Sequence, residues 1–392
     1  MNKGSRVLGE SFADIFSNGL IWFGAAVSVA EIEAGIQSGN NWLALITGHL
    51  LGGVLLFLVG LIGARLRLNA MNTTSTAFGV WGAKFFACLN LLQLVGWTAV
   101  MIAQGTSALG GLQKSLESPF TSAFLAIAIA TWLFVGIKKS INVATVGMAL
   151  LTILLVVLTY KLFSGSAVAL RASMSGQVPS ISFWSAFEIS VAMPLSWLPL
   201  ISDYTKDVRR PVVGTLTSAL VYTLVSIWMY GLGIVIGMSG MNSIPCAILA
   251  SGLGFAGVAI VAFSTIATTF LDAYSSGESA KTIYSKLNPK VVGAFTCAVG
   301  AALAISGIID RYTDFLYLIA SVFSPMASVL LVSHYFVKKI HVRWNLFSWG
   351  IGFMVYHVAS QYSLEFIGPS LMAMLFSALL TLVGLCLKEH AT

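Results

Sequence analysis

Acidic side chains within long apolar runs are the first chemical signal in this sequence. Glu31, Glu33, Glu188 and Asp272 each lie in such a run. A carboxylate at the centre of a membrane span costs about 2.5–3.5 kcal/mol on insertion scales, so a functional role is expected of it. Glu31 follows the small residues 25–30, where a helix can open and expose its backbone. It is a candidate to accept a substrate N–H or carry a proton; the alternative is a structural acid paired with a neighbouring helix.

Two prolines interrupt another apolar run in the second half of the chain. Pro194 and Pro199 each remove a backbone N–H from the helical ladder. Interruptions at matching places in two halves indicate an inverted-repeat transporter with its substrate site near the midplane. Met193, Ser196 and Trp197 would then line that site. A proline kink without function is the alternative.

A third apolar run carries an aromatic residue between two amides. Gln93, Trp97 and Gln104 fall on one face of a helix. An indole offers a stacking surface and the amides offer donors and acceptors, which together suit a planar hydrogen-bonding ring. The alternative is that Trp97 packs in the core.

Hydroxyl side chains form a stripe in a fourth run. Ser264, Thr265, Thr268 and Thr269 precede Asp272. Their oxygens can coordinate a hard cation, or they can simply bond back to carbonyls of their own helix. A broken first helix would supply further carbonyl ligands for a cation.

Lipid is the solvent that the composition indicates. Of the 392 residues, 57% are hydrophobic and only 9% are charged, whereas soluble domains carry about 25% charged residues. The net charge of +7 does not indicate nucleic acid binding, because the basic residues lie in short clusters between apolar runs. We therefore predict an all-α protein of the cell membrane.

Twelve runs are long enough to cross a bilayer, which takes about 20 apolar residues. The predicted spans are 17–37, 40–64, 83–107, 119–137, 142–163, 181–201, 212–238, 248–273, 291–309, 313–337, 345–361 and 367–387. No gap between them would hold a soluble domain, so residues 1–392 form one predicted transmembrane domain.

The distribution of basic residues predicts the orientation of these spans. If the N-terminus is cytoplasmic, all of the 21 Lys and Arg residues except Lys114, Lys161, Arg171 and Arg311 fall on the cytoplasmic side. Cytoplasmic loops are enriched in such residues. We therefore predict that both termini are cytoplasmic.

Several segments resemble, in their order and spacing, the nucleobase–cation symporters, the family that includes cytosine permease and the hydantoin transporter. The likeness is greatest to the hydroxymethylpyrimidine transporters within that family. The similar segments are 22–32, 63–68, 78–82, 96–101, 202–205 and 324–335. Together they extend over most of the chain.

This resemblance implies a leucine-transporter-like fold of five plus five inverted-repeat helices, 17–163 and 181–337, with two additional helices in 345–387. It implies a substrate site between the first, third, sixth and eighth helices, with Trp97 stacked on the substrate ring and Ser28 and Glu31 near it. It also implies a sodium site. The implied ligands are the Thr268 and Thr269 hydroxyls and the carbonyls of Thr265, Val27 and Ala30.

Departures from the family's pattern bear on the substrate. Met101 stands where the hydantoin transporter has a substrate-binding glutamine. Trp197 lies a few residues later, relative to Asp203, than the family's stacking tryptophan of the sixth helix, and the family's asparagine of the eighth helix is missing. An acid at Glu31, where relatives are neutral, suggests a substrate that bears an amino group. Asp272 completes the predicted substrate set.

The resulting hypothesis is a cation-coupled importer of a pyrimidine-type ring, such as hydroxymethylpyrimidine (a thiamine precursor) or a cytosine-like base, that works by alternating access. Sodium is the expected coupling ion, and a proton carried by Glu31 or Asp272 is the alternative. Other hypotheses are a passive channel or facilitator and a transporter of another small amino-bearing solute. No convergent catalytic set indicates an enzyme, and we expect no cofactor.

Overall fold

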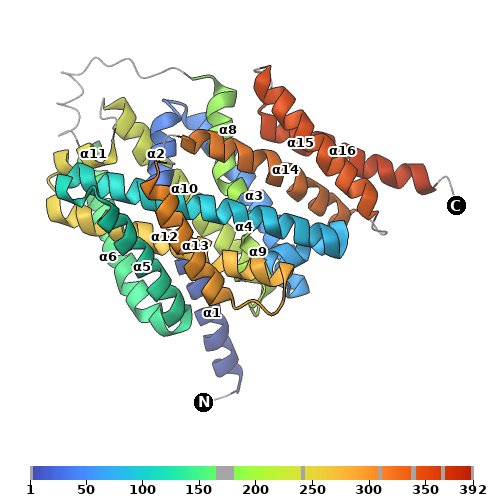
Figure 1. Ribbon diagram of the computed structural model, residues 1–392, viewed down its shortest axis with the longest axis horizontal. Coiled ribbons are helices and arrows are strands. Elements are labelled where there is room, and N and C mark those ends of the chain that lie inside the picture. Colours follow the sequence, from blue (N-terminus) through green and yellow to red (C-terminus); the bar gives the residue numbers. More distant parts are fainter. Residues whose placement is uncertain are drawn as a thin grey trace.

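The computed structural model describes residues 3–164, 181–239, 243–307, 311–336, 341–362 and 367–389. Every regular element in these ranges is a helix (Figure 1). The first half contains α1 (Lys3–Ala26), α2 (Val29–Gln37), α3 (Trp42–Leu66), α4 (Ala70–Leu112), a short 3-10 helix (Lys114–Leu116), α5 (Pro119–Val135) and α6 (Ile137–Phe163). The second contains α8 (Phe183–Ser196), α9 (Ile201–Thr205), α10 (Pro211–Met238), α11 (Ile244–Ala250), α12 (Gly254–Ile283), α13 (Pro289–Ile305) and α14 (Tyr312–Tyr335). The chain continues with α15 (Val342–Gln361) and α16 (Pro369–Glu389).

Each predicted span coincides with a helix or a broken pair of helices. The first span is the pair α1 and α2, bent by 50° where residues 27 and 28 leave the helix. The sixth span is α8 and α9, separated by a turn at 197–200. Both predicted interruptions are therefore present.

Two predicted boundaries were wrong because buried polar residues extend helices beyond their apolar runs. The third span begins at Ala70 instead of residue 83, since Asn69 caps it and Thr73 and Thr74 bond to carbonyls of their own helix. The eighth ends at Ile283 instead of residue 273. Its added residues 275–279 are buried, and some of them bond to other helices. They do not face lipid and therefore need not be apolar. The eighth span also starts later than predicted, at Gly254 instead of 248, because residues 248–250 belong to the separate helix α11.

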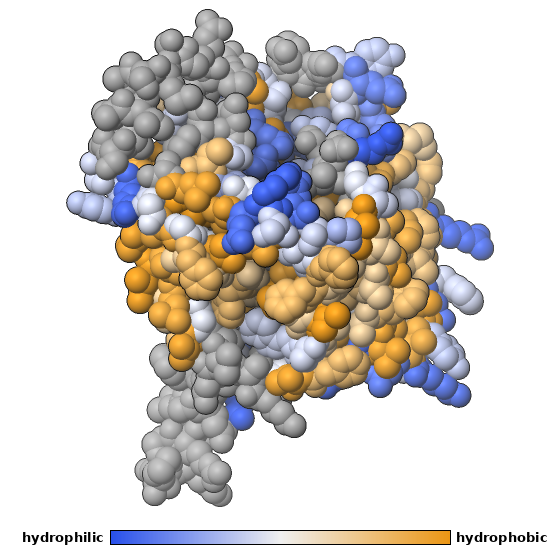
Figure 2. All heavy atoms as spheres, turned by 60° about the vertical axis from the view of Figure 1, so that its left-hand side comes forward, coloured by the Kyte–Doolittle hydropathy of each residue, from blue (hydrophilic) through white to orange (hydrophobic). Residues whose placement is uncertain are grey.

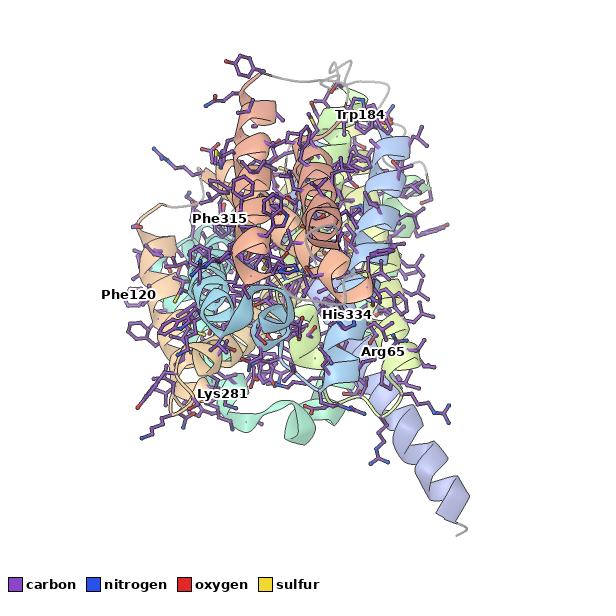
Figure 3. All side chains as sticks on the ribbon, turned by 90° about the vertical axis from the view of Figure 1, so that its right-hand side faces the viewer. Arg65, Phe120, Trp184, Lys281, Phe315 and His334 are labelled. Carbon is purple, nitrogen blue, oxygen red and sulfur yellow. The ribbon has the colours of Figure 1, made fainter. Side chains whose placement is uncertain are left out.

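The surface of the described residues fits a bilayer. Among them, six helices are long and apolar enough to cross a membrane, and the bent α1–α2 pair makes a seventh such span. Figure 2 shows apolar side chains in a broad band across one face, with hydrophilic ones gathered above it and at its lower edge. In Figure 3, Trp184 lies near one end of the molecule and Lys281 and Arg65 lie toward the other. The protein is thus a multi-pass membrane protein; the number of spans and the cytoplasmic termini stay predictions.

Helix α4 runs through the interior and packs along α12 and α13, while α10 packs along α1, α2 and α3. The large side chains between these helices, Trp22, Tyr222 and Tyr230, are fully buried. These contacts hold the α1–α2 break between the two halves of the chain.

The buried Glu188 joins α8 to the last two helices. Its carboxylate accepts hydrogen bonds from the Ser370 backbone N–H at 3.2 Å, from the Ser370 hydroxyl and from the Tyr356 hydroxyl at 3.3 Å. A carboxylate at the start of α16 also interacts favourably with the helix dipole. This acid has a structural explanation in its contacts with α15 and α16.

Helices α2 and α10 approach each other so closely that only glycine fits between them. A Cβ added at Gly35 would lie 2.3 Å from the Tyr230 carbonyl oxygen, and one added at Gly233 would lie 2.1 Å from the Ile32 carbonyl oxygen. Small residues at membrane helix interfaces permit such backbone contact.

We expect Gly35→Ala to destabilise the protein, because its methyl group must displace backbone. Overpacking of this kind costs about 1–3 kcal/mol. The measurement is the thermal unfolding midpoint of the purified protein in detergent. Gly350→Ala on α15 is the matched control, since nothing lies within 4 Å of its added Cβ. Equal midpoints for the two variants would refute the close contact.

Candidate functional site

A small cavity lies where the two broken helices meet α4 and α12. Its volume is about 20 Å³, little more than the space that one water needs. A ring-sized solute would require the walls to move apart. The lining residues are Ala25, Ser28, Ala30, Glu31, Trp97, Met101, Met193, Ser196, Trp197, Leu200, Thr268 and Asp272.

Most of the predicted substrate residues lie around this central cavity. Those that line it are Ser28, Glu31, Trp97, Met101, Met193, Ser196, Trp197 and Asp272. Gln93 and Gln104 do not. The Gln93 amide donates to Asn90 Oδ1 at 2.8 Å and to the Ser196 carbonyl at 3.4 Å. Gln104 lines a separate cavity.

The break between α1 and α2 is stabilised by a local cap. Ser28 has an extended backbone, and its Oγ accepts a hydrogen bond from the Glu31 N–H at 3.1 Å. Capping by serine satisfies one of the free N–H groups at the start of a helix. The positive end of the α2 dipole therefore lies beside the cavity and favours an electron-rich group there.

Glu31 is held at the cavity wall by α10. Its Oε1 accepts from the Tyr222 hydroxyl at 2.8 Å and its Oε2 accepts from the Ser226 hydroxyl at 2.6 Å. His49 Nε2 lies 2.7 Å from the same Ser226 oxygen. The carboxyl is therefore paired with a neighbouring helix, as the structural alternative expects, and it also lines the cavity.

The residues that hold Glu31 were not identified from the sequence. A signal for two of them is present, because Ser218, Tyr222, Ser226 and Tyr230 recur every fourth residue in a largely apolar helix. That spacing marks one polar face. Sequence alone does not show which acid this face meets.

Aromatic contacts fix the two indoles that line the cavity. The ring of Trp97 lies edge-on to Phe315 and Tyr312, with centroids 5.6 and 6.1 Å apart. Trp197 lies edge-on to Trp22 and Tyr222 at 5.5 and 6.0 Å. Such pairs contribute about 0.5–1.5 kcal/mol each beyond their buried area and orient the rings.

Hydroxyls of α12 bind the carbonyls that the first break releases. Thr268 Oγ1 donates to the Gly24 carbonyl at 2.9 Å and lies 3.2 Å from that of Val27, and Ser264 Oγ donates to Val27 at 2.8 Å. Carbonyl and hydroxyl oxygens are the ligands that a hard cation prefers. Two hydroxyls and two carbonyls therefore meet at the first break.

The other predicted cation ligands lie differently. The Thr269 hydroxyl donates to the Thr265 carbonyl at 2.7 Å, so these two bond within α12. The Ala30 carbonyl is 3.5 Å from the Tyr312 hydroxyl on α14. Gly24, which the sequence reasoning missed, precedes Val27 by nearly one helical turn and is the second carbonyl that meets Thr268.

Asp272 adds a second carboxyl to the cavity from α12 and is 3% exposed. Among the described residues, no side chain or backbone group forms a hydrogen bond with this carboxyl. It differs in this from Glu31, and it is available to a donor on a bound solute.

Polar contacts close the protein below the cavity, toward the predicted cytoplasmic side. Asn90 donates to the Pro199 carbonyl at 3.1 Å and to Ser279 Oγ at 2.8 Å. The Tyr204 hydroxyl donates to the Leu271 carbonyl at 2.8 Å. We name this set of contacts the inner closure.

An ion pair completes the inner closure. Lys206, which follows α9, pairs with Glu278 of α12. Since α9 is half of a broken helix, these contacts between α9, α4 and α12 are what must separate if the cavity is to open on this side.

Two broken helices that meet at a mid-membrane cavity, with oxygen ligands beside one break, define a secondary transporter. Residues 12–389 match the family described as permease for cytosine/purines, uracil, thiamine, allantoin. The chain therefore belongs to this permease family.

Individual relatives agree with this assignment. YxlA of Bacillus subtilis, whose name assigns it provisionally to the purine-cytosine permeases, is 24% identical over 81% of this chain and 75% of its own. The hydantoin permease of Microbacterium maritypicum is 23% identical over 91% of this chain and 82% of its own.

The fold is also that of a solved transporter. The structure of Mhp1, a nucleobase-cation-symport-1 family transporter in a closed conformation with bromovinylhydantoin bound, matches with a TM-score of 0.68 at 19% identity. The match covers 94% of this chain and 91% of Mhp1. The predicted leucine-transporter-like fold is confirmed.

We expect Glu278→Gln to weaken the inner closure. A partly buried ion pair contributes on the order of 1 kcal/mol, which corresponds to a roughly fivefold shift toward the open state. The measurement is the rate at which a permeant maleimide labels Ser275→Cys, a position that is buried in the closure. The control is Glu117→Gln, because Glu117 pairs with Lys114 on the opposite side of the molecule. An unchanged labelling rate would contradict this role of the pair.

Proposed function

We propose that the protein imports an amino-bearing pyrimidine together with a cation by alternating access. The proposed substrate is hydroxymethylpyrimidine or a cytosine-like base, and the proposed coupling ion is sodium. The proposed setting is the cell membrane, with both termini in the cytoplasm.

The lining of the cavity supports a planar amino-bearing ring. Trp97 and Trp197 supply aromatic surface, and Glu31 and Asp272 supply hydrogen-bond acceptors. A ring with an exocyclic amino group offers N–H donors that match carboxylate oxygens. The relatives are named for hydantoin and for purines and cytosine, which are also planar nitrogen-containing rings.

One observation carries the proposal of cation coupling. Thr268 lines the cavity and also bonds the Gly24 and Val27 carbonyls at the first break. Ser28 and Glu31, just beyond that break, line the same cavity. A cation bound by these oxygens would stabilise the arrangement of α1, α2 and α12 that the substrate needs, and this shared dependence is a coupling free energy between two ligands.

Uptake into proteoliposomes tests the proposal. An inward sodium gradient should drive accumulation of cytosine or hydroxymethylpyrimidine above the outside concentration. Accumulation driven only by a proton gradient would replace sodium with a proton, for which Glu31 and Asp272 are the candidates. Equilibration without accumulation under either gradient would establish a passive facilitator and refute the proposal.

We expect Trp97→Ala to raise the Kd for the substrate. Stacking of a base on an aromatic side chain contributes about 1–3 kcal/mol, so the loss corresponds to roughly 5- to 150-fold. Isothermal titration in detergent with saturating sodium measures it. Trp97→Phe keeps an aromatic face and should retain most of the affinity. Equal losses in both variants would argue against stacking.

We expect Thr268→Val to remove most of the sodium dependence of substrate binding. Valine has nearly the same shape but lacks the hydroxyl that meets both carbonyls. The measurement is the ratio of substrate Kd values without and with sodium, which should fall toward one. Thr131→Val on α5, where the hydroxyl bonds only to its own helix, should leave the ratio unchanged. A Thr268→Val ratio equal to that of the unmodified protein would contradict the cation site.

A further inference from the structure

A second, larger cavity lies on the opposite side of the central cavity from the inner closure. We name it the vestibule. Its volume is about 400 Å³, and it is enclosed by α2, α4, α11 and the start of α14. It is large enough for a single-ring solute, whereas the central cavity of about 20 Å³ is not.

The vestibule contains hydrogen-bond acceptors from two helices. Glu33 of α2 lines it, and Gln37 one turn away forms a hydrogen bond with the Glu33 carboxylate. Gln104 of α4 lines it too and is 95% buried, since its side chain is only 5% exposed. Among the described residues, its Oε1 has no hydrogen-bond partner. A buried amide oxygen without a donor costs about 1–3 kcal/mol, and a ligand N–H would satisfy it once the amide turns toward the vestibule.

Tyr312 separates the vestibule from the central cavity. It lines the vestibule, its ring packs edge-on to Trp97 at 6.1 Å, and its hydroxyl lies 3.5 Å from the Ala30 carbonyl. Trp97 and Ala30 both line the central cavity. The two cavities therefore share a wall one aromatic residue thick.

We propose that the vestibule is a second binding site for the transported solute, with Glu33 and Gln104 accepting N–H groups of an amino-bearing ring against the face of Tyr312. The proposal rests on the proposed function for the identity of the solute. It gives a role to Glu33 and Gln104, which do not line the central cavity. In this arrangement, a solute occupies the vestibule before the wall at Tyr312 opens.

Cys246 provides a direct probe of occupancy. It lines the vestibule and is exposed, whereas Cys297 is buried. Cys88→Ser and Cys386→Ser together leave Cys246 as the readily labelled thiol. The rate of its reaction with an impermeant maleimide is measured with and without cytosine or hydroxymethylpyrimidine. Transport by this background protein is verified first.

The expected result is protection by the solute. At about ten times its Kd, roughly one site in eleven remains free, so labelling should slow by about tenfold. Protection should persist in Trp97→Ala, which removes a stacking surface of the central cavity and one edge contact of Tyr312 but leaves Glu33, Gln104 and Tyr312 in place. It should be lost in Glu33→Gln and in Gln104→Leu. Glu117→Gln, which removes a charge outside the vestibule, is the matched control and should keep it.

Two controls test whether the protecting ligand is a ring that bears N–H donors. Unsubstituted pyrimidine has no N–H donor and should give no protection. Sodium alone should give none, and protection by sodium alone equal to that by cytosine would overturn the assignment to a ring.

Closure of the protein over a centrally bound solute could also hide Cys246. In that case protection disappears in Trp97→Ala and survives in Glu33→Gln and Gln104→Leu, and the vestibule site is wrong. A protein that accumulates the solute but shows no protection refutes the vestibule site and leaves the proposed function intact. A protein that neither transports nor is protected by any ring refutes both.

Discussion

The backbone carbonyls released at the α1–α2 break impose the constraint from which the rest of the site follows. Lipid offers no hydrogen-bond donors, so polar backbone groups at that depth must be satisfied inside the protein. Ser28 caps the start of α2, and Ser264 and Thr268 of α12 reach the Gly24 and Val27 carbonyls. The proposed cation would bind these same oxygens, with the hydroxyl protons turned away from it. Under the proposed function, the contacts that permit the break are also those that a bound cation would alter.

A second set of contacts places the acid beside the break. Gly35 and Gly233 allow the backbones of α2 and α10 to meet, and this approach brings Tyr222 and Ser226 within hydrogen-bond distance of Glu31. A buried carboxyl without such donors would be costly. The chemistry of the central cavity thus depends on residues of α10 that do not line it. Substitutions at the helix contact should alter solute recognition as well as stability.

The sequence was informative wherever a residue type is costly in lipid. Apolar runs predicted where the helices are, and the isolated acid, the prolines and the hydroxyl stripe predicted where they break and meet. Boundaries failed at Ala70 and Ile283, since buried polar residues that bond to carbonyls of their own helix or to other helices resemble loop residues in the sequence. The partners of Glu31 were not predicted, for a related reason. The sequence shows that α10 has a polar face, but which helix packs against that face depends on the tertiary structure. Gln104 followed the face of Trp97 and still reached a different cavity, because α4 is long enough to pass both.

The two halves of the broken sixth span are each attached by a buried carboxylate at the start of another helix. On one side of the turn at 197–200, α8 is fastened to α16 by the buried Glu188 and its bonds to Ser370. On the other, Asp203 of the five-residue α9 is buried and accepts a hydrogen bond from the Ala70 N–H, at the start of α4, at 2.8 Å. Hydroxyls of α9 are also bonded inside the protein, since Thr205 donates to the Gly60 carbonyl of α3 and Tyr204 to the Leu271 carbonyl of α12. The turn at 197–200 is therefore a four-residue link between two separately anchored pieces, α8 on α16 and α9 on α4, and any movement of one relative to the other must bend the chain there.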